Sequence, residues 1–323
     1  MRLLVTGGAG YIGSICVETL LDAGHEVLIL DNFSEGHHAA IDPRAKCIEI
    51  DLAELEKLIT TFKKFSPDAV LHFAGKALVS ESMKDPSIYY RVNVSCGVNV
   101  LDAMLASNCK KIIFSSSCAT YGIPEKMPID ERTPQKPVNP YGHSKLLFEQ
   151  ILKWYEQIHG ITHVILRYFN AAGASKKLGE HHRVETHLIP NVLKVALGQA
   201  EYVPVYGNHY PTPDATCIRD YIHVLDLASA HRLALDVKES AAYNLGTGDG
   251  HSVLQIVEAA RKVTGHEIPV QFLPPRAGDP PRLVASAHKI HQELGWVPQF
   301  SHLTELVTSA WNWHKAHKKG YAD

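Results

Sequence analysis

The feature that most constrains this chain is a glycine-spaced turn directly after its first apolar segment. Residues 2–6 read Arg-Leu-Leu-Val-Thr, and Gly7, Gly10 and Gly13 follow at intervals of three. In this pattern the first glycine permits a tight turn, the second lets a pyrophosphate approach the backbone, and the third lets a helix pack closely on a strand. The N-terminus of the following helix, with its free N–H groups and positive dipole end, favours phosphate. The stretch therefore predicts a strand, a phosphate-binding turn and a helix that runs toward Gly24.

A second apolar segment provides the next strand and the terminal acid that accompany such a turn in dinucleotide-binding folds. Glu26–Leu30 reads as a strand that ends at Asp31. A carboxylate about 20 residues after the glycines can accept a hydrogen bond from a ribose 2′-hydroxyl, and it repels a 2′-phosphate. The cofactor predicted is therefore NAD rather than NADP. A glycine triplet alone can be merely structural, but strand, triplet, helix, strand and terminal acid together indicate an α/β chain with a Rossmann-type doubly wound parallel sheet.

Composition narrows the class of protein. With 323 residues, of which 45% are hydrophobic, the chain can form one large core and a second lobe. The net charge of −2 gives no indication of the basic surface that binds nucleic acid, and no apolar run approaches the length of a membrane span. The 6 cysteines include no C-x-x-C pair, which fits reduced core residues in a cytoplasmic protein. Because the first strand begins at once, we expect no signal peptide.

The 20 histidines raise the question of a metal site. The densest group lies within Glu180–His187, and it lacks the His-Glu-x-x-His spacing of a zinc-binding helix. We therefore predict a polar loop that precedes a helix, and no metal.

Further elements can be placed by their apolar patterns. Lys46–Ile50 reads as a third strand, and Asp51 could cap a helix over Ala53–Lys64. Asp68–Gly75 reads as a fourth strand with its loop, and the carboxyl ends of such strands border the ligand crevice. Pro86–Ala106 reads as one long helix.

A serine run and a tyrosine–lysine pair are the candidates for catalysis. Lys111–Phe114 reads as a fifth strand and leads into a serine run that ends at Ser117; alone, such a run is also typical of an ordinary turn. Tyr141 and Lys145 open a helix that continues to about residue 159, and a spacing of four places them on one helix face. Following a dinucleotide-binding fold, the three side chains indicate a Ser/Tyr/Lys catalytic set.

The chemistry gives each member a role. A phenol has a pKa of ~10. The ammonium of Lys145 and the positive nicotinamide ring should favour the phenolate, so that Tyr141 can act as a general base near neutral pH. Lys145 can also hold the nicotinamide ribose. Ser117 can hydrogen-bond the reacting hydroxyl and share its proton.

The glycine turn resembles that of the extended short-chain dehydrogenases/reductases, because Gly7–Gly13 matches their Gly-Gly-x-Gly-Tyr/Phe-Ile-Gly pattern. Members often carry a lysine at the position of Ala77, whereas here Lys76 stands one place earlier. Motif and resemblance together predict these NAD-binding residues: Gly7, Gly10, Tyr11, Ile12, Gly13, Asp31, Asn32, Asp51, Leu52, Phe73, Ala74, Gly75, Lys76, Asn93, Ser117, Tyr141, Lys145 and Phe169.

The remainder of the chain reads as a second lobe. A sixth strand over Ile161–Asn170 is followed by a composition richer in Pro, His and Tyr. We expect a Rossmann domain over residues 1–169 and a smaller mixed α/β substrate lobe over 170–323, with part of 215–250 returning to the first domain. Within the lobe, helices are predicted over 188–198, 225–237 and 252–264, and strands over 202–207, 216–224 and 243–246.

Six motifs extend a resemblance to the UDP-glucose (UDP-galactose) 4-epimerases over nearly the whole chain. They are Phe114–Ser117, Pro140–Lys145, Arg167–Asn170, Tyr206–Thr212, Arg219–Val224 and Arg276–Asp279. The resemblance implies that Asn170, Leu188, Arg219, Arg276 and Asp279 hold UDP, that Tyr206 lines the uracil pocket, that His187 replaces an asparagine beside the uridine, and that Leu283 lies where a tyrosine can close the sugar pocket. Two arginines suit a diphosphate, although Arg219 could instead pair with Asp220 or another acid.

The implied activity is NAD-dependent inversion of C4 of UDP-hexoses through a transient 4-keto sugar. Because Leu283 is smaller than tyrosine, N-acetylated UDP-sugars are also expected as substrates. One alternative is a related dehydratase or decarboxylase, but dehydratases carry an Asp-Glu pair where Cys118 and Ala119 stand. Another is a silent NAD-binding regulator, which the intact catalytic set disfavours. The resemblance also suggests a homodimer that forms through the helices over 86–106 and 141–159.

Overall fold

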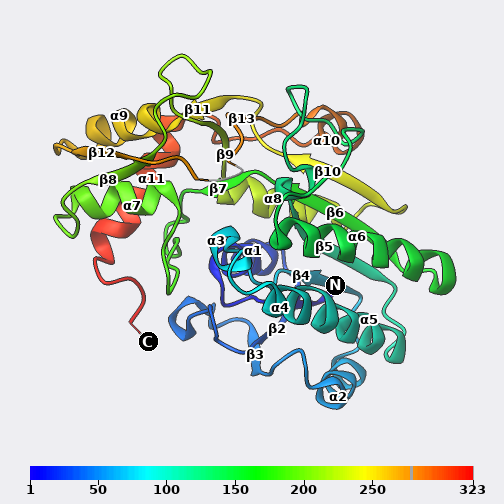
Figure 1. The fold of residues 1–323 in the computed structure, drawn as a ribbon. Coiled ribbons are helices and arrows are strands. Elements are labelled where there is room, and N and C mark those ends of the chain that lie inside the picture. The colour runs from blue at the N-terminus through cyan, green and yellow to red at the C-terminus, as the bar shows by residue number, and fades with distance from the viewer. Residues whose placement is uncertain (277–278, 323) are drawn as a thin grey trace.

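The computed structural model describes residues 1–276 and 279–322 (Figure 1). Its main body is a seven-stranded sheet in the order β10-β6-β5-β4-β1-β2-β3, and every neighbouring pair is parallel. The strands are β1 (Arg2–Thr6), β2 (Glu26–Asp31), β3 (Lys46–Glu49), β4 (Ala69–His72), β5 (Lys111–Ser117), β6 (Thr162–Tyr168) and β10 (Ala241–Leu245). The predicted doubly wound α/β fold is confirmed.

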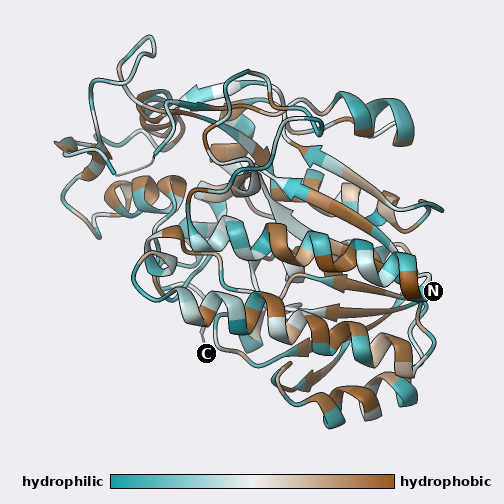
Figure 2. Cartoon of the chain, turned by 45° about the vertical axis from the view of Figure 1, so that its right-hand side comes forward, coloured by the Kyte–Doolittle hydropathy of each residue, from teal (hydrophilic) through white to brown (hydrophobic). Residues whose placement is uncertain are grey.

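Helices cover both faces of the sheet because successive strand residues point to opposite sides. Leu3 and Val5 pack toward α1 (Tyr11–Asp22), α8 (Val224–Ala234) and α10 (His288–Leu294). Leu4, between them, packs toward α2 (Leu55–Phe65), α5 (Cys96–Ala106) and α6 (Pro140–His159). In Figure 2 the central strands are largely brown, the colour of hydrophobic residues, and brown segments recur along the helices that cover them.

The strand order places a topological switch beside β1. From β1 the chain proceeds outward through β2 to β3, and it then returns to β4 on the other side of β1. In sheets of this kind ligands bind beyond the carboxyl ends of the strands at the switch. Strand β10 comes from the C-terminal part of the chain and pairs with β6, with Asn244 opposite Arg167. The division of the chain after residue 169 stays a prediction.

The C-terminal lobe contains two small sheets with their own hydrophobic core. One sheet has β9 (Ile218–His223) at its centre, paired with β7 (Asn170–Ala172), β11 (Gly250–Ser252) and β13 (Arg282–Leu283), and the other pairs β8 (Val203–Tyr206) with β12 (Val270–Leu273). The helices of this lobe are α7 (Leu188–Ala196), α9 (Val253–Thr264) and α11 (Leu303–Ala316). Ala277 and Gly278, within the Arg276–Asp279 motif, and Asp323 lie outside the described residues.

Two predicted elements differ from the structure. The long helix expected over 86–106 is divided into α4 (Pro86–Tyr89), a π-helical turn η2 (Tyr90–Ser95) and α5. The serine run is part of β5, because Ser115–Ser117 pairs with residues 166–168 of β6. Short helical turns α3 (Val79–Ser82), η1 (His38–Ala40) and η3 (Cys118–Tyr121) occupy loops. No helix in 1–276 or 279–322 is both long and apolar enough to cross a membrane.

Candidate active site

The glycine turn joins β1 to α1. Gly7 has φ +71°, and a Cβ at this position would lie 2.6 Å from the amide nitrogen of Ala74. A Cβ at Gly13 would lie 2.1 Å from the carbonyl oxygen of Gly7, so both positions require glycine. At Gly10 a Cβ would meet only that carbonyl, at 3.4 Å, among the described residues. Gly10 is therefore the position at which a phosphate could approach the backbone.

The other residues predicted around the turn are anchored to neighbouring segments. The Tyr11 hydroxyl donates to the carbonyl of Gly173, in the loop after β7, at 2.7 Å. The amides of Phe73 and Ala74 both donate to the last carbonyl of β1, at 3.0 and 3.1 Å. Ile12 and Phe73 pack against one hydrophobic cluster. The turn is thus fixed both to β4 and to the second lobe.

Asp31, at the carboxyl end of β2, is buried and hydrogen-bonded. Its Oδ2 accepts from the amide of Ala9 at 2.9 Å, and its Oδ1 accepts from the amide of Phe33 at 2.9 Å. These bonds orient the carboxylate beside the glycine turn. Since each carboxylate oxygen has two lone pairs, Asp31 retains acceptors for a ribose hydroxyl.

Asn32 and Asp51, predicted near the adenosine, are in contact. The Asn32 Nδ2 donates to Asp51 Oδ2 at 2.8 Å, and Leu52 is buried next to them. The prediction that Asp51 caps a helix is wrong, because α2 begins only at Leu55. Asp51 Oδ1 instead accepts from the amide of Ala53 at 2.8 Å and forms a turn before that helix.

Asn93, in the π-helical turn, holds the loop that follows β4. Its Oδ1 accepts from the amide of Lys76 at 2.7 Å, and its Nδ2 donates to the Lys76 carbonyl at 3.0 Å and to Ser144 Oγ at 2.9 Å. A Cβ at Gly75 would lie 2.9 Å from this Oδ1. The Lys76 ammonium pairs with Glu35. Asn93 thereby ties the predicted cofactor loop to helix α6.

The three candidate catalytic residues come together at the carboxyl end of β5. Ser117 ends that strand, and its side chain lies near enough to the Tyr141 hydroxyl to influence the pKa of that phenol. One turn further along α6, Lys145 Nζ donates to the Ser115 carbonyl at 2.9 Å. Phe169 is buried at the end of the neighbouring strand β6.

Burial dominates the titration of the tyrosine and the lysine. It raises the pKa of Tyr141 to about 12, although the neighbouring Ser117 side chain opposes the shift. Burial lowers the pKa of Lys145 to about 8, and the negative charge of Glu149 opposes this change. The expected lowering of the tyrosine pKa by Lys145 is therefore not produced by the protein's own groups.

The start of α6 is set by local capping. Asn139 Oδ1 accepts from the amide of Gly142 at 2.8 Å, and Pro140 occupies the first turn, where its missing N–H has no helical partner to lose. A Cβ at Gly142 would lie 2.4 Å from the Ala119 carbonyl. The helix can therefore approach the segment after Ser117 closely enough for Tyr141 to reach it.

A buried network missed by sequence reasoning holds α6 on the sheet. The Glu149 carboxylate accepts from Arg167 Nε at 3.0 Å and Nη2 at 2.7 Å, and from Ser116 Oγ at 2.5 Å. Arg167 Nη1 donates to the Tyr121 hydroxyl at 2.8 Å. One feature of the sequence could have pointed to Glu149: it lies four residues beyond Lys145 and therefore on the same helix face.

Two arginines on the C-terminal lobe lie among the predicted substrate residues. Arg219 pairs with Asp279, and the Arg276 guanidinium lies 3.9 Å from the ring centroid of Tyr206. Arg219 does not pair with Asp220. The Asp220 carboxylate accepts instead from three backbone amides and one hydroxyl, in residues 247, 248 and 285.

Three predicted substrate residues stand at element boundaries. Asn170 opens β7 opposite Tyr221 of β9, and Leu188 is the first residue of α7. His187 precedes that helix, and its Nδ1 lies 2.9 Å from Glu185 Oε1. One edge of the His187 ring therefore faces an acid, and its contact with a uridine stays a prediction.

Leu283 lies on β13 opposite Arg219. It packs, partly buried, against a cluster that contains Phe169, with Cys118 also packed there. Since Cys118 follows Ser117 directly, Leu283 lies close to the candidate catalytic set.

Comparisons with known proteins identify the family of this chain. The sequence model of the NAD dependent epimerase/dehydratase family matches residues 3–246. The chain is 48% identical to a UDP-glucose 4-epimerase of Streptococcus mutans over 100% of the chain and 99% of that protein. A crystal structure of UDP-glucose 4-epimerase from Brucella ovis in complex with NAD has a TM-score of 0.94 at 44% identity, covering 97% of this chain and 98% of the other. The enzyme from Bifidobacterium longum in complex with NAD+ and UDP gives 0.95 at 39%, covering 99% and 100%.

Proposed function

The chain belongs to the NAD dependent epimerase/dehydratase family, and we propose from this premise that it inverts C4 of UDP-glucose and UDP-galactose. The observation that carries the proposal is the meeting of three side chains at the carboxyl end of β5: Ser117 ends that strand near the Tyr141 hydroxyl, and Lys145, one helical turn further along α6, donates to the Ser115 carbonyl at 2.9 Å. Ser117 ends β5, a strand of the same sheet as β1, from which the glycine turn starts. A full-length relative named as a UDP-glucose 4-epimerase is 48% identical to this chain.

The residues around the glycine turn fit NAD. A phosphate can approach the backbone at Gly10, whereas the carboxylate of Asp31 suits a free ribose hydroxyl and disfavours a phosphate there. When bound, NAD supplies reversible hydride exchange at C4 and a positively charged nicotinamide ring. Lys145, fixed by the Ser115 carbonyl, would hold the adjoining ribose.

Proton transfer falls to Tyr141 and Ser117. Oxidation at C4 releases the proton of the 4-hydroxyl, which Tyr141 takes while Ser117 hydrogen-bonds the same oxygen. Return of that proton completes the reduction of the 4-keto sugar from its opposite face. Because burial raises the pKa of Tyr141 to about 12, proton removal at neutral pH depends on added positive charge, which the oxidised cofactor would provide.

Arg219 and Arg276 would anchor the diphosphate while the sugar turns. The Arg219 guanidinium pairs with Asp279, and the Arg276 guanidinium lies over the Tyr206 ring. Charge-assisted bonds from arginine to phosphate are strong. We expect the diphosphate to share Arg219 with Asp279. Anchoring through UDP leaves the hexose free to present either face at C4.

A product assay tests the function. Incubation with UDP-galactose should yield UDP-glucose without loss of water. A dehydratase would release water, whereas a decarboxylase, which needs a C6 carboxylate that UDP-galactose lacks, and a silent regulator would both yield no product. Tyr141→Phe should nearly abolish conversion yet retain NAD, because only the proton acceptor is removed. Wild-type turnover in that variant would refute the assignment of Tyr141.

We also propose a homodimer through α6 and its neighbours. Trp154 and Ile158, one turn apart on α6, are 60% and 66% exposed. Adjacent large apolar side chains that are exposed on a monomer often mark a surface that binds another protein. Light scattering should give twice the chain mass of 35.7 kDa. Trp154→Glu should yield a monomer, while Phe272→Glu, an equivalent change on β12, should not. A dimeric Trp154→Glu would exclude this face.

A cytoplasmic location is proposed as well. All six cysteines are free. Burial raises the pKa of Cys16, Cys109 and Cys118, so their thiols are poorly reactive structural residues. Fractionation of cells that express the protein would test the location.

A further inference from the structure

Four metal-ligating side chains converge in the loop between β7 and α7. They belong to Glu180, His182, Glu185 and His187, and one nitrogen or oxygen of each lies within 4.8 Å of all the others. The expectation of no metal rested on the missing His-Glu-x-x-His spacing. That spacing applies to a helix, whereas here an irregular loop turns the side chains toward one point.

The distances suit a small tetrahedral ion. His182 Nδ1 lies 3.1 Å from Glu185 Oε2 and 3.6 Å from Glu180 Oε1. His187 Nδ1 lies 2.9 Å from Glu185 Oε1 and 3.2 Å from Glu180 Oε1. Ligands at about 2.0–2.1 Å from a tetrahedral zinc ion are about 3.3 Å apart, so these four separations lie close to that value, and one atom of each ligand lies within 4.8 Å of the others.

Charge also favours a cation. The side chains of Glu180 and Glu185 are only 5% and 4% exposed. Within the described residues, their ion pairs are with His182 and His187 alone. Two buried carboxylates without a lysine or arginine are costly to desolvate, and a divalent ion at the convergence point would neutralise both.

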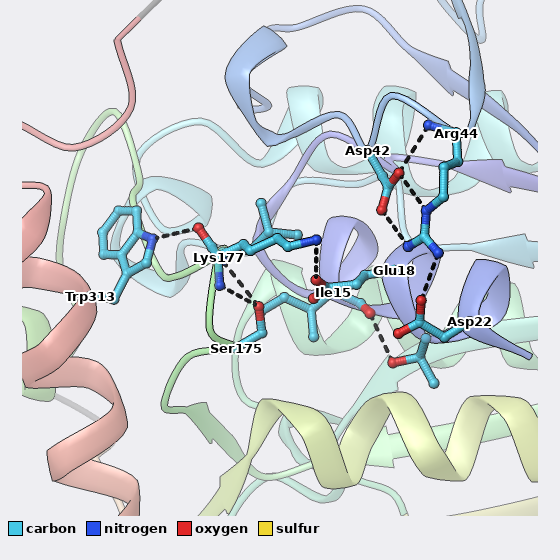
Figure 3. Close-up of polar contacts among 10 residues, drawn as sticks. Ile15, Glu18, Asp22, Asp42, Arg44, Ser175, Lys177 and Trp313 are labelled. Atoms are coloured by element: carbon cyan, nitrogen blue, oxygen red, sulfur yellow. Dashed lines mark hydrogen bonds and ion pairs between the residues drawn. The ribbon is translucent and has the colours of Figure 1, made fainter.

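The loop is held in place before the cluster. The carbonyl of Lys177 accepts from Trp313 Nε1 of α11 at 3.2 Å, and the Lys177 ammonium lies 3.8 Å from Glu18 of α1, as Figure 3 shows. The amide of Gly179 donates to the Tyr321 hydroxyl at 3.0 Å. These contacts preorganise the first ligand, Glu180, so the site does not depend on a freely moving loop.

Arg183, which lies between two of the four cluster residues in the sequence, connects this loop to the segment after β2. Arg183, between the ligands His182 and Glu185, donates to the carbonyls of Phe33, Ser34 and Gly36 at 3.0–3.2 Å. Those carbonyls follow Asp31. An ion that fixes the cluster would therefore also fix Arg183, and through it the segment beside the predicted adenosine ribose.

We propose that Glu180, His182, Glu185 and His187 bind one Zn²⁺ ion that braces the second lobe against the loop after β2. Two imidazoles and two carboxylates form a complete tetrahedral set, and a site with four protein ligands and no open position is structural rather than catalytic. Mixed nitrogen and oxygen ligands suit Zn²⁺ better than Mg²⁺ or Ca²⁺, which prefer oxygen.

Metal analysis of the intact enzyme tests the proposal. The wild type, produced with added zinc and desalted without chelator, should contain about one zinc per chain by elemental mass spectrometry. His182→Ala should lose it. The matched control His181→Ala should retain it, because His181 is the adjacent histidine but its ring stacks on His37 outside the cluster. Glu185→Gln, which keeps the shape, should also lose the ion and serves if His182→Ala does not fold.

Thermal unfolding gives a second measurement. Stripping the wild type with a chelator should lower Tm, and Zn²⁺, not Mg²⁺, should restore it. His182→Ala should show no response to Zn²⁺. Wild type without stoichiometric zinc and without a Tm response would overturn the proposal. Equal zinc in the wild type and in His182→Ala would overturn it too, because the ion would then be bound elsewhere.

Discussion

Replacing Glu149 with glutamine should destabilise the protein and slow its catalysis together. The side chains of Glu149 and Arg167 are 1% and 5% exposed, and both carboxylate oxygens accept from the guanidinium. Ser116 and Gln135 each donate one further bond to that carboxylate. Glutamine keeps the shape but removes the charge, and its amide directs N–H groups at neighbours that are themselves donors.

The magnitude follows from the burial of the pair. Removing one member of a buried ion pair costs about 3–5 kcal/mol, because the remaining charge is left uncompensated. We expect the free energy of unfolding to fall by that amount. The matched control is Asp130→Asn, which breaks the pair with Arg132, a side chain that is 92% exposed. That change should cost at most about 1 kcal/mol.

Urea unfolding followed by tryptophan fluorescence measures both variants, and the m-value reports whether the transition keeps its form. Turnover of UDP-galactose, measured well below the unfolding transition, should fall in Glu149→Gln, because α6 also carries Tyr141 and Lys145. A loss below about 1 kcal/mol with unchanged m would show that the buried pair does not hold the helix. Lower stability with full turnover would show that the Glu149–Arg167 pair stabilises the fold but is not needed for catalysis.

Three further outcomes are expected. Because burial lowers the pKa of Lys145 to about 8, its charge is lost as pH rises through that value, so kcat/KM should decline above about pH 8; in Lys145→Arg any remaining activity should lack that decline. Asp31→Ala should narrow the preference for NAD over NADP, measured by binding to the stripped protein, and an unchanged preference would contradict the role of Asp31. Leu283→Tyr should remove conversion of UDP-N-acetylglucosamine and spare UDP-galactose, whereas Leu283→Met should affect neither; absence of N-acetyl conversion in the wild type would refute the expectation.

The sequence by itself determined the parts of this protein that rest on neighbouring residues. The glycine turn could be predicted because its requirements are largely local: Gly7 has φ +71° in the turn, and a Cβ at Gly13 would lie 2.1 Å from the Gly7 carbonyl oxygen. The pairing of Tyr141 with Lys145 follows from helical spacing alone. Family resemblance then supplied the activity, which full-length relatives support.

Tertiary structure decided whatever depends on segments far apart in the chain. Ser115–Ser117 is a strand and not a turn because β6 lies beside it to pair with. The Glu149–Arg167 pair and the Arg219–Asp279 pair join residues that are far apart in the sequence, and no local pattern shows which residues pair.

Burial is likewise invisible in a linear sequence. Chemistry alone predicted a lowered pKa for Tyr141, but its enclosure at the end of β5 raises that pKa to about 12. The convergence of Glu180–His187 has the same origin. The segment lacks the His-Glu-x-x-His spacing, and the path of the loop brings the four ligand atoms together. Local spacing determines which residues can act, whereas desolvation and long-range contact determine how they do.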